Sequence, residues 1–143
     1  MSTNNTHFAN LLKIGHLKQE PFIQAEFNGL VTTAKRKLVD AKNTLLSADS
    51  RFDLAYNAAH ALSLAALRAC GYRSENRYVV FQLLEVTAEL PPSSWRIFST
   101  AHQKRNLAEY EGVIEIENTL LEALIEATQN LSDILSSKQT KTP

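Results

Sequence analysis

The chain has 143 residues, of which 44% are hydrophobic and 21% are charged, a composition typical of a single soluble globular domain. Its 15 basic and 15 acidic residues cancel, which argues against the overall positive field of a dedicated nucleic-acid-binding protein. Only four glycines and four prolines are present, too few for a turn-rich all-β domain. We expect one domain over residues 1–143, with a core from about 20 to 135 and flexible termini.

The single cysteine and the hydropathy of the chain bear on its location. Cys70 lies in the apolar run LSLAALRAC, where a lone thiol is expected to be buried and reduced. The N-terminal stretch lacks the basic segment and long apolar run of a signal peptide. No run reaches the ~18 apolar residues that span a membrane. The sequence predicts a cytoplasmic protein without a membrane segment.

Apolar residues at intervals of three and four predict helices along most of the chain. A short helix is expected from 7 to 17, ending near Gly15. Pro21 fits the first turn of a second helix, from about 22 to 46. The third predicted helix, 52–70, is rich in alanine, which lets neighbouring helices approach closely. We therefore place it at the centre of the fold.

Polar residues and glycine predict where the next helices begin and end. Ser50, with Asp53 three residues later, fits a capping box at the start of the third helix, and Gly71 fits its end. Ser74 is expected to cap a fourth helix that runs through Val86. The β-like run at residues 78–81 continues into this helical spacing.

Two further helices complete the expected fold. Pro91-Pro92 ends the fourth helix, and Ser93 or Ser94 is expected to cap a helix over 95–110. A heptad-like apolar seam predicts the last helix over 113–135. The predicted fold is all-α, an antiparallel up-and-down bundle of four long helices plus one or two short ones.

Several kinds of enzyme site are excluded by spacing. The lone cysteine and the histidines form no zinc-binding pattern, and the glycines form neither a phosphate-binding loop nor a Gly-x-Ser-x-Gly turn. The histidines are His7, His16, His60 and His102. We expect no metal and no cofactor.

Polar residues around Arg105 form the first candidate site. Arg105 is followed by Asn106, and Glu109 lies four positions later, where it can pair with Arg105 on one helix face. Tyr110 is five positions from Arg105, rotated by about 140° on an ideal helix, so the two converge only if the helix end unwinds or a second subunit contributes. The alternative is a surface Arg–Glu pair beside a core tyrosine.

A second candidate pair lies on the alanine-rich helix. Tyr56 and His60 are four residues apart, so their polar ends share one face. They form either part of a binding site or a core-edge pair hydrogen-bonded to a neighbouring helix.

The charges are distributed unevenly along the sequence. Six basic residues precede six glutamates, and no lysine or arginine lies between 106 and 137. The two groups form either solvated faces or a basic groove beside an acidic outer face, and the acidic helix argues against broad nucleic-acid binding. The basic residues are Arg68, Arg73, Arg77, Arg96, Lys104 and Arg105, and the glutamates are Glu109, Glu111, Glu115, Glu117, Glu122 and Glu126.

Two stretches resemble HEPN-domain proteins. Residues 51–62, followed by 65–73, are similar to the central helix of small HEPN proteins, in which an alanine-rich helix with an aromatic residue ends in a Gly-Tyr-Arg-like turn. Arg105-Asn106 followed by Tyr110 resembles a variant of the family's Arg-x4–6-His motif, with tyrosine in the place of histidine. The resemblance covers roughly residues 20–135.

The resemblance implies a function and a set of site residues. In ribonucleolytic members, the arginine and histidine of the motif act together at a dimer interface. For this chain we expect a homodimeric interaction module of toxin–antitoxin or defence type, binding RNA or a nucleotidyltransferase partner. A metal-independent endoribonuclease toxin and a purely structural bundle are the alternatives. The expected site residues are Arg105, Asn106, Tyr110 and His102 for catalysis, with Tyr56, His60 and Arg73 for binding.

Overall fold

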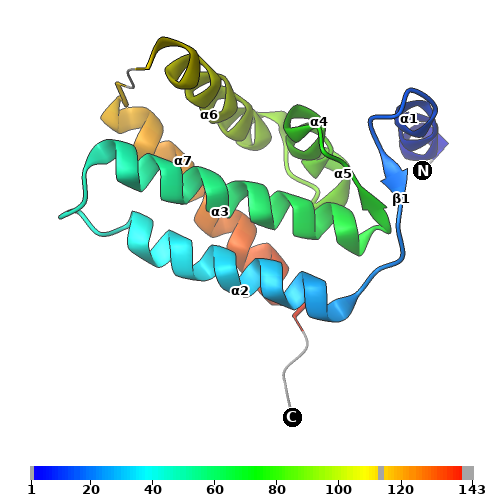
Figure 1. Cartoon of the computed structure of the whole chain (residues 1–143). Helices are drawn as coiled ribbons and strands as arrows, with labels where there is room; N and C mark the ends of the chain where they lie inside the picture. The colour runs from blue at the N-terminus through cyan, green and yellow to red at the C-terminus, as the bar shows by residue number, and fades with distance from the viewer. Residues whose placement is uncertain (1, 113–114, 140–143) are drawn as a thin grey trace.

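The computed structural model describes residues 2–112 and 115–139 and is almost entirely helical (Figure 1). The predicted all-α class is confirmed. The elements in chain order are α1 (Ser2–Lys13), β1 (Lys18–Gln19), α2 (Gln24–Ala41), α3 (Ala48–Ala69), β2 (Tyr72–Arg73), α4 (Arg77–Gln82), α5 (Leu84–Thr87), α6 (Pro92–Glu111) and α7 (Asn118–Ser136).

A hairpin of α2 and α3 forms the centre of the fold. A turn over residues 42–47 joins the two helices, which lie side by side over most of their length (Figure 1). The buried face of α2 follows the predicted spacing of three and four residues. The alanines of α3 allow the close packing expected of a central helix. The buried residues of α2 are Phe27, Val31, Ala34, Leu38 and Ala41.

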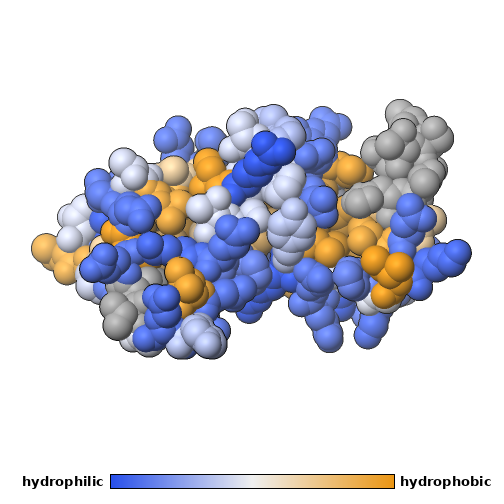
Figure 2. Space-filling model, turned by 90° about the horizontal axis from the view of Figure 1, so that it is seen from above, coloured by the Kyte–Doolittle hydropathy of each residue, from blue (hydrophilic) through white to orange (hydrophobic). Residues whose placement is uncertain are grey.

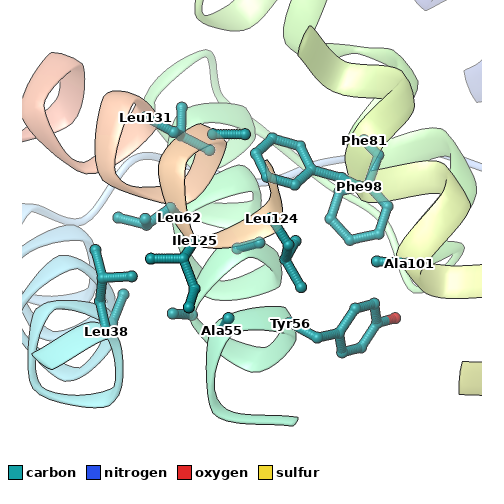
Figure 3. Packing of buried hydrophobic residues seen from close by; sticks show 14 of the residues in the cluster. Leu38, Ala55, Tyr56, Leu62, Phe81, Phe98, Ala101, Leu124, Ile125 and Leu131 are labelled. Carbon is teal, nitrogen blue, oxygen red and sulfur yellow. The ribbon is translucent and has the colours of Figure 1, made fainter. Parts of the chain in front are cut away.

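The remaining long helices cover this hairpin. α7 packs against α3 and α2 and crosses behind them in Figure 1, while α6 packs against α4 and α7. Figure 3 shows their buried side chains meeting around α3, with Leu124 and Leu131 of α7 facing Leu62 of α3. Each fully buried leucine or phenylalanine contributes about 1.5–3 kcal/mol to folding. This core fixes where the polar side chains at its edge lie.

A smaller apolar cluster attaches the N-terminal segment. Phe8 of α1 stacks on Tyr72 with ring centroids 4.7 Å apart, and both contact a group that includes Leu67. β1 and β2 pair antiparallel, with Lys18 opposite Arg73. This short ladder was not predicted, because two residues are too few to show a strand period.

The start of α3 differs from the prediction. Ser47 caps the helix, accepting a hydrogen bond from the Ser50 backbone N–H at 3.3 Å, so the capping box predicted at Ser50 and Asp53 is wrong. The helix therefore begins at Ala48, and Asp53 lies in its second turn. The predicted glycine stop is confirmed, since Gly71 follows the helix with a left-handed φ of 86°.

Two other predicted caps also differ from the structure. Asn76, rather than Ser74, caps α4 by accepting from the Val79 backbone N–H, while Ser74 donates to the His16 carbonyl. α6 begins at Pro92 with no side-chain cap, so the caps predicted at Ser93 or Ser94 are wrong. Proline fits this position because its missing N–H would have no helical partner. The predicted start of the last helix, Val113, lies outside the described residues.

Two apolar residues that were expected to be buried are exposed in the structure. Cys70 was expected to be buried but is exposed, because it follows the last turn of α3. Leu45 was expected on the α2 stripe, but α2 ends at Ala41 and Leu45 is 92% exposed in the turn. None of the helices described is both long and apolar enough to cross a membrane.

Candidate functional site

Tyr56, in the middle of α3, joins three helices through its side chain. Its ring is buried, and Figure 3 shows its hydroxyl oxygen pointing away from the labelled aliphatic side chains. The hydroxyl accepts a hydrogen bond from Nη1 of Arg77 on α4 at 3.1 Å and lies 2.8 Å from Nδ1 of His102 on α6. A buried hydroxyl needs such partners, since leaving it unpaired costs about 1–3 kcal/mol.

Two arginines lie against the Tyr56 ring. Cζ of Arg105 is 4.9 Å from the ring centroid and Cζ of Arg77 is 5.6 Å from it, both within cation–π range. Nη1 of Arg105 also donates to Oδ1 of Asn57 at 3.2 Å. Two positive guanidinium groups are thus held around one aromatic ring, which concentrates positive potential at this place.

The two arginines differ in their counter-charges. Arg105 forms ion pairs with Asp53 and with Glu109, each at 3.6 Å. In the described part of the chain, no carboxylate lies within ion-pair distance of Arg77, which bonds instead to the neutral Tyr56 hydroxyl. Arg77 therefore carries the less compensated of the two charges.

His102 lies parallel to Tyr56, with ring centroids 6.2 Å apart and 9° between the planes. Its Nε2 is 3.3 Å from Nδ2 of Asn106, one turn further along α6. Burial lowers the pKa of His102 below its ordinary value, and the charges of Arg77 and Arg105 lower it further, so the ring is neutral near pH 7.

The hydrogen-bond partners of His102 determine which of its two ring nitrogens carries the hydrogen. A neutral imidazole has one donor and one acceptor nitrogen. If the Asn106 amide nitrogen donates to Nε2, the ring hydrogen is on Nδ1 and is donated to Tyr56; if the Tyr56 hydroxyl donates to Nδ1, the hydrogen is on Nε2 and the Asn106 amide turns its oxygen toward it. In the first of these arrangements His102 presents a proton acceptor on the side of Asn106.

These side chains surround a cavity of about 250 Å³ between α3, α4 and α6. Four of the residues that line it were expected to form the site: Tyr56, His102, Arg105 and Asn106. Its space suits one small polar group rather than a drug-sized ligand, for which cavities of about 300–1,000 Å³ are usual. Arg77 and Glu109 complete its lining.

Tyr110 does not join this group. α6 continues regularly to Glu111 and ends at Gly112, whose φ is 74°, so the helix does not unwind before Tyr110. The Tyr110 side chain is 91% exposed and does not line the cavity. In place of Tyr110, the structure brings His102 next to Arg105, since three residues on a helix return to nearly the same face.

His60 lies one turn from Tyr56, and the two rings pack against the same Phe81 side chain. The His60 ring packs edge-on against Phe81 at 6.0 Å, and it does not line the cavity. Burial is the main cause that lowers the pKa of His60 to about 4, followed by the charges of Arg77 and His102. His60 is therefore a neutral edge of the core at pH 7.

Arg73, expected to bind a ligand, lies at the far end of α3 in a different network. It pairs with Glu20 at 2.7 Å and with Glu26. The fully buried Arg68 donates to Glu26 at 2.6 Å and to the carbonyls of Glu20 and Pro21. These bonds tie the segment before α2 to the end of α3, so Arg68 and Arg73 have a structural role and do not extend the cavity.

The other members of the basic series are also separated in space. Arg96 lies over the Trp95 ring at 5.9 Å, and Lys104 pairs with Glu117 at 3.3 Å. The surface seen from above mixes hydrophilic and hydrophobic residues over the whole face (Figure 2). Of the six basic residues, Arg77 and Arg105 are the two that line the cavity.

Sequence reasoning did not assign Arg77 or Glu109 to the site. Glu109 was recognised only as a partner for Arg105, and Arg77 only as one of several basic residues. A usable signal was the polar stripe of Asp53, Asn57 and His60 on the alanine-rich helix, which marks the face that receives α6. The position of Arg77 opposite this stripe depends on how α4 packs.

Neither a metal site nor a similar known protein indicates what the cavity binds. No group of three or more potential metal ligands occurs within residues 2–112 and 115–139. Comparisons with protein-family models, curated proteins and solved structures gave no match. The resemblance to HEPN domains therefore rests on the sequence pattern quoted above.

Proposed function

We propose that this chain is a HEPN-like helical module that binds a phosphate group of RNA in the cavity between Arg77 and Arg105. The observation that carries the proposal is the convergence of two guanidinium groups around Tyr56, with the amide of Asn106 beside them. Guanidinium groups match phosphate oxygens in geometry and charge.

The charge environment supports a phosphate ligand of moderate affinity. The charge of Arg77 is not balanced by a described carboxylate, because its described hydrogen-bond partner is the neutral Tyr56 hydroxyl. Asp53 and Glu109 reduce the attraction of Arg105, and the whole chain carries no net charge. We therefore expect specific binding to one phosphate, without the strong general attraction of a basic protein.

The same geometry favours binding over efficient cleavage. RNA cleavage without metal needs one group that accepts a proton and another that donates one. His102 is the histidine that lines the cavity, and Tyr110 lies outside it. Tyr56 is buried in the network as a hydrogen-bond partner, so the cavity supplies one suited proton-transfer group.

A metal-independent ribonuclease is the second candidate, and the position of His102 favours it. In this mechanism Nε2 takes the proton of a ribose 2′-hydroxyl as its oxygen attacks the adjacent phosphorus. The bond from phosphorus to the 5′-oxygen breaks, and the leaving oxygen takes a proton from solvent water. Arg105 would stabilise the charge that develops on the phosphate oxygens. The products are a 2′,3′-cyclic phosphate and a 5′-hydroxyl end.

A binding experiment tests the first candidate. Fluorescence anisotropy with a labelled single-stranded oligoribonucleotide should show that Arg77→Ala and Arg105→Ala each lower affinity at least about fivefold. The salt slope of log K should fall by about 0.7 for each lost phosphate contact. Arg36→Ala is the matched control, because Arg36 is exposed on α2 and does not line the cavity. Equal losses in the control, or no binding by the wild type, would reject the proposal.

Analysis of the RNA products separates the two candidates. Under the first candidate, the oligoribonucleotide stays intact during incubation with purified protein and a chelator. Cleavage to 2′,3′-cyclic phosphate ends, lost in His102→Gln and Arg105→Ala, would show the ribonuclease instead.

The cellular setting is also part of the proposal. The resemblance implies a homodimer in a cytoplasmic toxin–antitoxin or defence system, with a nucleotidyltransferase as partner. Leu107 and Tyr110, three residues apart on α6 and 51% and 91% exposed, offer an apolar contact for a second copy. Analytical ultracentrifugation should give a dimer that Leu107→Asp weakens. A monomer at high concentration would contradict the dimer.

A further inference from the structure

Two carboxylates bracket Arg105 at the rim of the cavity. Asp53 approaches from α3 and Glu109 from α6, each 3.6 Å from a guanidinium nitrogen. Glu109 also lines the cavity itself. Both distances exceed those of a short charge-assisted hydrogen bond, about 2.7–2.9 Å, so the two carboxylates compensate the charge of Arg105 without saturating its donors.

These ion pairs add little to the stability of the fold. The side chains of Asp53 and Glu109 are 59% and 68% exposed, and exposed ion pairs contribute little. Arg105 also precedes Glu109 in α6, the less favourable order for a pair four residues apart on a helix. The position of these two carboxylates is better explained by their electrostatic effect on a ligand of the cavity.

The charges around the cavity cancel. Arg77 and Arg105 supply two positive charges, and Asp53 and Glu109 supply two negative ones. His102 is neutral near pH 7, so it leaves this balance unchanged. A phosphate oxygen placed between the two guanidinium groups would gain their hydrogen bonds whatever the total charge of the ligand. Further negative charge gains no net attraction from the four groups.

We infer that the cavity selects a singly charged phosphodiester over a terminal phosphate, and that Asp53 and Glu109 set this selectivity. The inference rests on the proposed function, since it assumes that a phosphate binds between Arg77 and Arg105. An internal phosphodiester carries one negative charge, whereas a phosphomonoester carries about 1.5–2 at pH 7. The ligand is therefore the interior of a nucleic-acid strand, and neither a mononucleotide nor a strand end.

The physical reason is the cost of removing charge from water. A terminal phosphate loses more hydration than a diester when it enters a partly enclosed site. The additional charge also lies close to Glu109, which repels it. The two carboxylates already balance the charge of the two arginines as a set. No net positive charge at the cavity therefore offsets the repulsion by Glu109.

A minimal pair of ligands tests the selectivity. Adenosine 5′-monophosphate and its 5′-monomethyl ester differ by one methyl group and by the second ionisation. Titration of isotope-labelled protein, followed by NMR, gives both dissociation constants. The wild type should bind the methyl ester about fivefold more tightly, and Glu109→Gln should remove most of this difference by strengthening monophosphate binding. Asp53→Asn should act in the same direction.

The control variant makes the same change of charge outside the cavity, and two outcomes would contradict the inference. Glu111→Gln makes the same change of charge at an exposed residue on the end of α6 that does not line the cavity, so it should leave the selectivity unchanged. Equal affinity of the wild type for both ligands overturns the inference but leaves the proposed function standing. An equal effect of Glu109→Gln and Glu111→Gln on the selectivity has the same consequence. Failure of both ligands and of the oligoribonucleotide to bind rejects the proposed function together with the inference.

Discussion

The hydroxyl of Tyr56 lies 2.8 Å from Nδ1 of His102, although the two residues are 46 positions apart in the chain. The same hydroxyl accepts a hydrogen bond from Arg77. One oxygen atom therefore holds a histidine of α6 and an arginine of α4 against α3. The geometry of the candidate site depends on this atom.

Tyr56→Phe should lower the free energy of unfolding by about 1–2 kcal/mol, since it leaves Arg77 and His102 without their shared partner. RNA affinity should also fall, because the Arg77 guanidinium is no longer oriented. Urea denaturation and anisotropy titration measure the two effects. Tyr110→Phe is the control, because its hydroxyl belongs to a side chain that is 91% exposed. Equal effects in the two variants would contradict the role of the Tyr56 hydroxyl.

The free energy of unfolding should depend on pH because His60 is buried. Its pKa is lowered from 6.5 to about 4, so the unfolded chain binds a proton at a higher pH than the folded one. The stabilisation is present above pH 6.5 and is lost as the pH falls through 4. Urea midpoints should therefore decline from pH 6.5 downward, before most carboxylates titrate.

Substitution of His60 isolates this contribution. His60→Gln should flatten the decline between pH 6.5 and 4.5, and His16→Gln should not, because His16 is exposed. A wild-type slope in both variants would show that burial does not lower the pKa of His60.

Arg68 and Arg73 lie in one network but should differ in their contribution to stability. Arg68→Ala leaves Glu26 and three backbone carbonyls without a fully buried partner, so we expect a loss of about 3 kcal/mol in the free energy of unfolding. Arg73 is 30% exposed, and Arg73→Ala should cost about 1 kcal/mol or less. Chemical denaturation compares the two, and similar losses would contradict the assignment of Arg68 as the main tie between α3 and the segment before α2.

Glu109 should also influence the ionisation of His102. The carboxylate of Glu109 raises the pKa of His102 and opposes the lowering by burial and by the two arginines. Glu109→Gln should therefore lower the pKa of His102 further, as measured from the pH dependence of its ring NMR signals. Glu111→Gln should change it much less. An unchanged or raised pKa in Glu109→Gln would disagree with the geometry.

Local patterns predicted the helices well where burial follows a helical period. The spacing of Phe27, Val31, Ala34 and Leu38 predicted both α2 and its buried face. The same rule extended α2 to Leu45, which is exposed, because a stripe of apolar residues does not show where the backbone turns. Caps were predicted at the wrong serines for a similar reason. Several neighbouring polar residues can cap a helix, and packing selects among them.

The candidate site was predicted in part. Arg105, Asn106 and His102 lie on one stretch of helix, and Tyr56 was recognised from its helical face. Tyr110 was favoured over His102 because the family pattern places the ionisable residue after the arginine. In the regular helix, however, His102 lies on the face of Arg105 and Tyr110 does not.

The sequence by itself determined the all-α class, the central alanine-rich helix and the run that contains Arg105, because these depend on neighbours within about one to two turns of helix. Only the tertiary structure decided which arginines have which partners. Arg68 is buried among acceptors 42 to 48 positions away, whereas Arg77 reaches Tyr56 from 21 positions away. Identical side chains thus acquire either a structural role or a place in the candidate site from long-range packing, which fixes their burial and counter-charges.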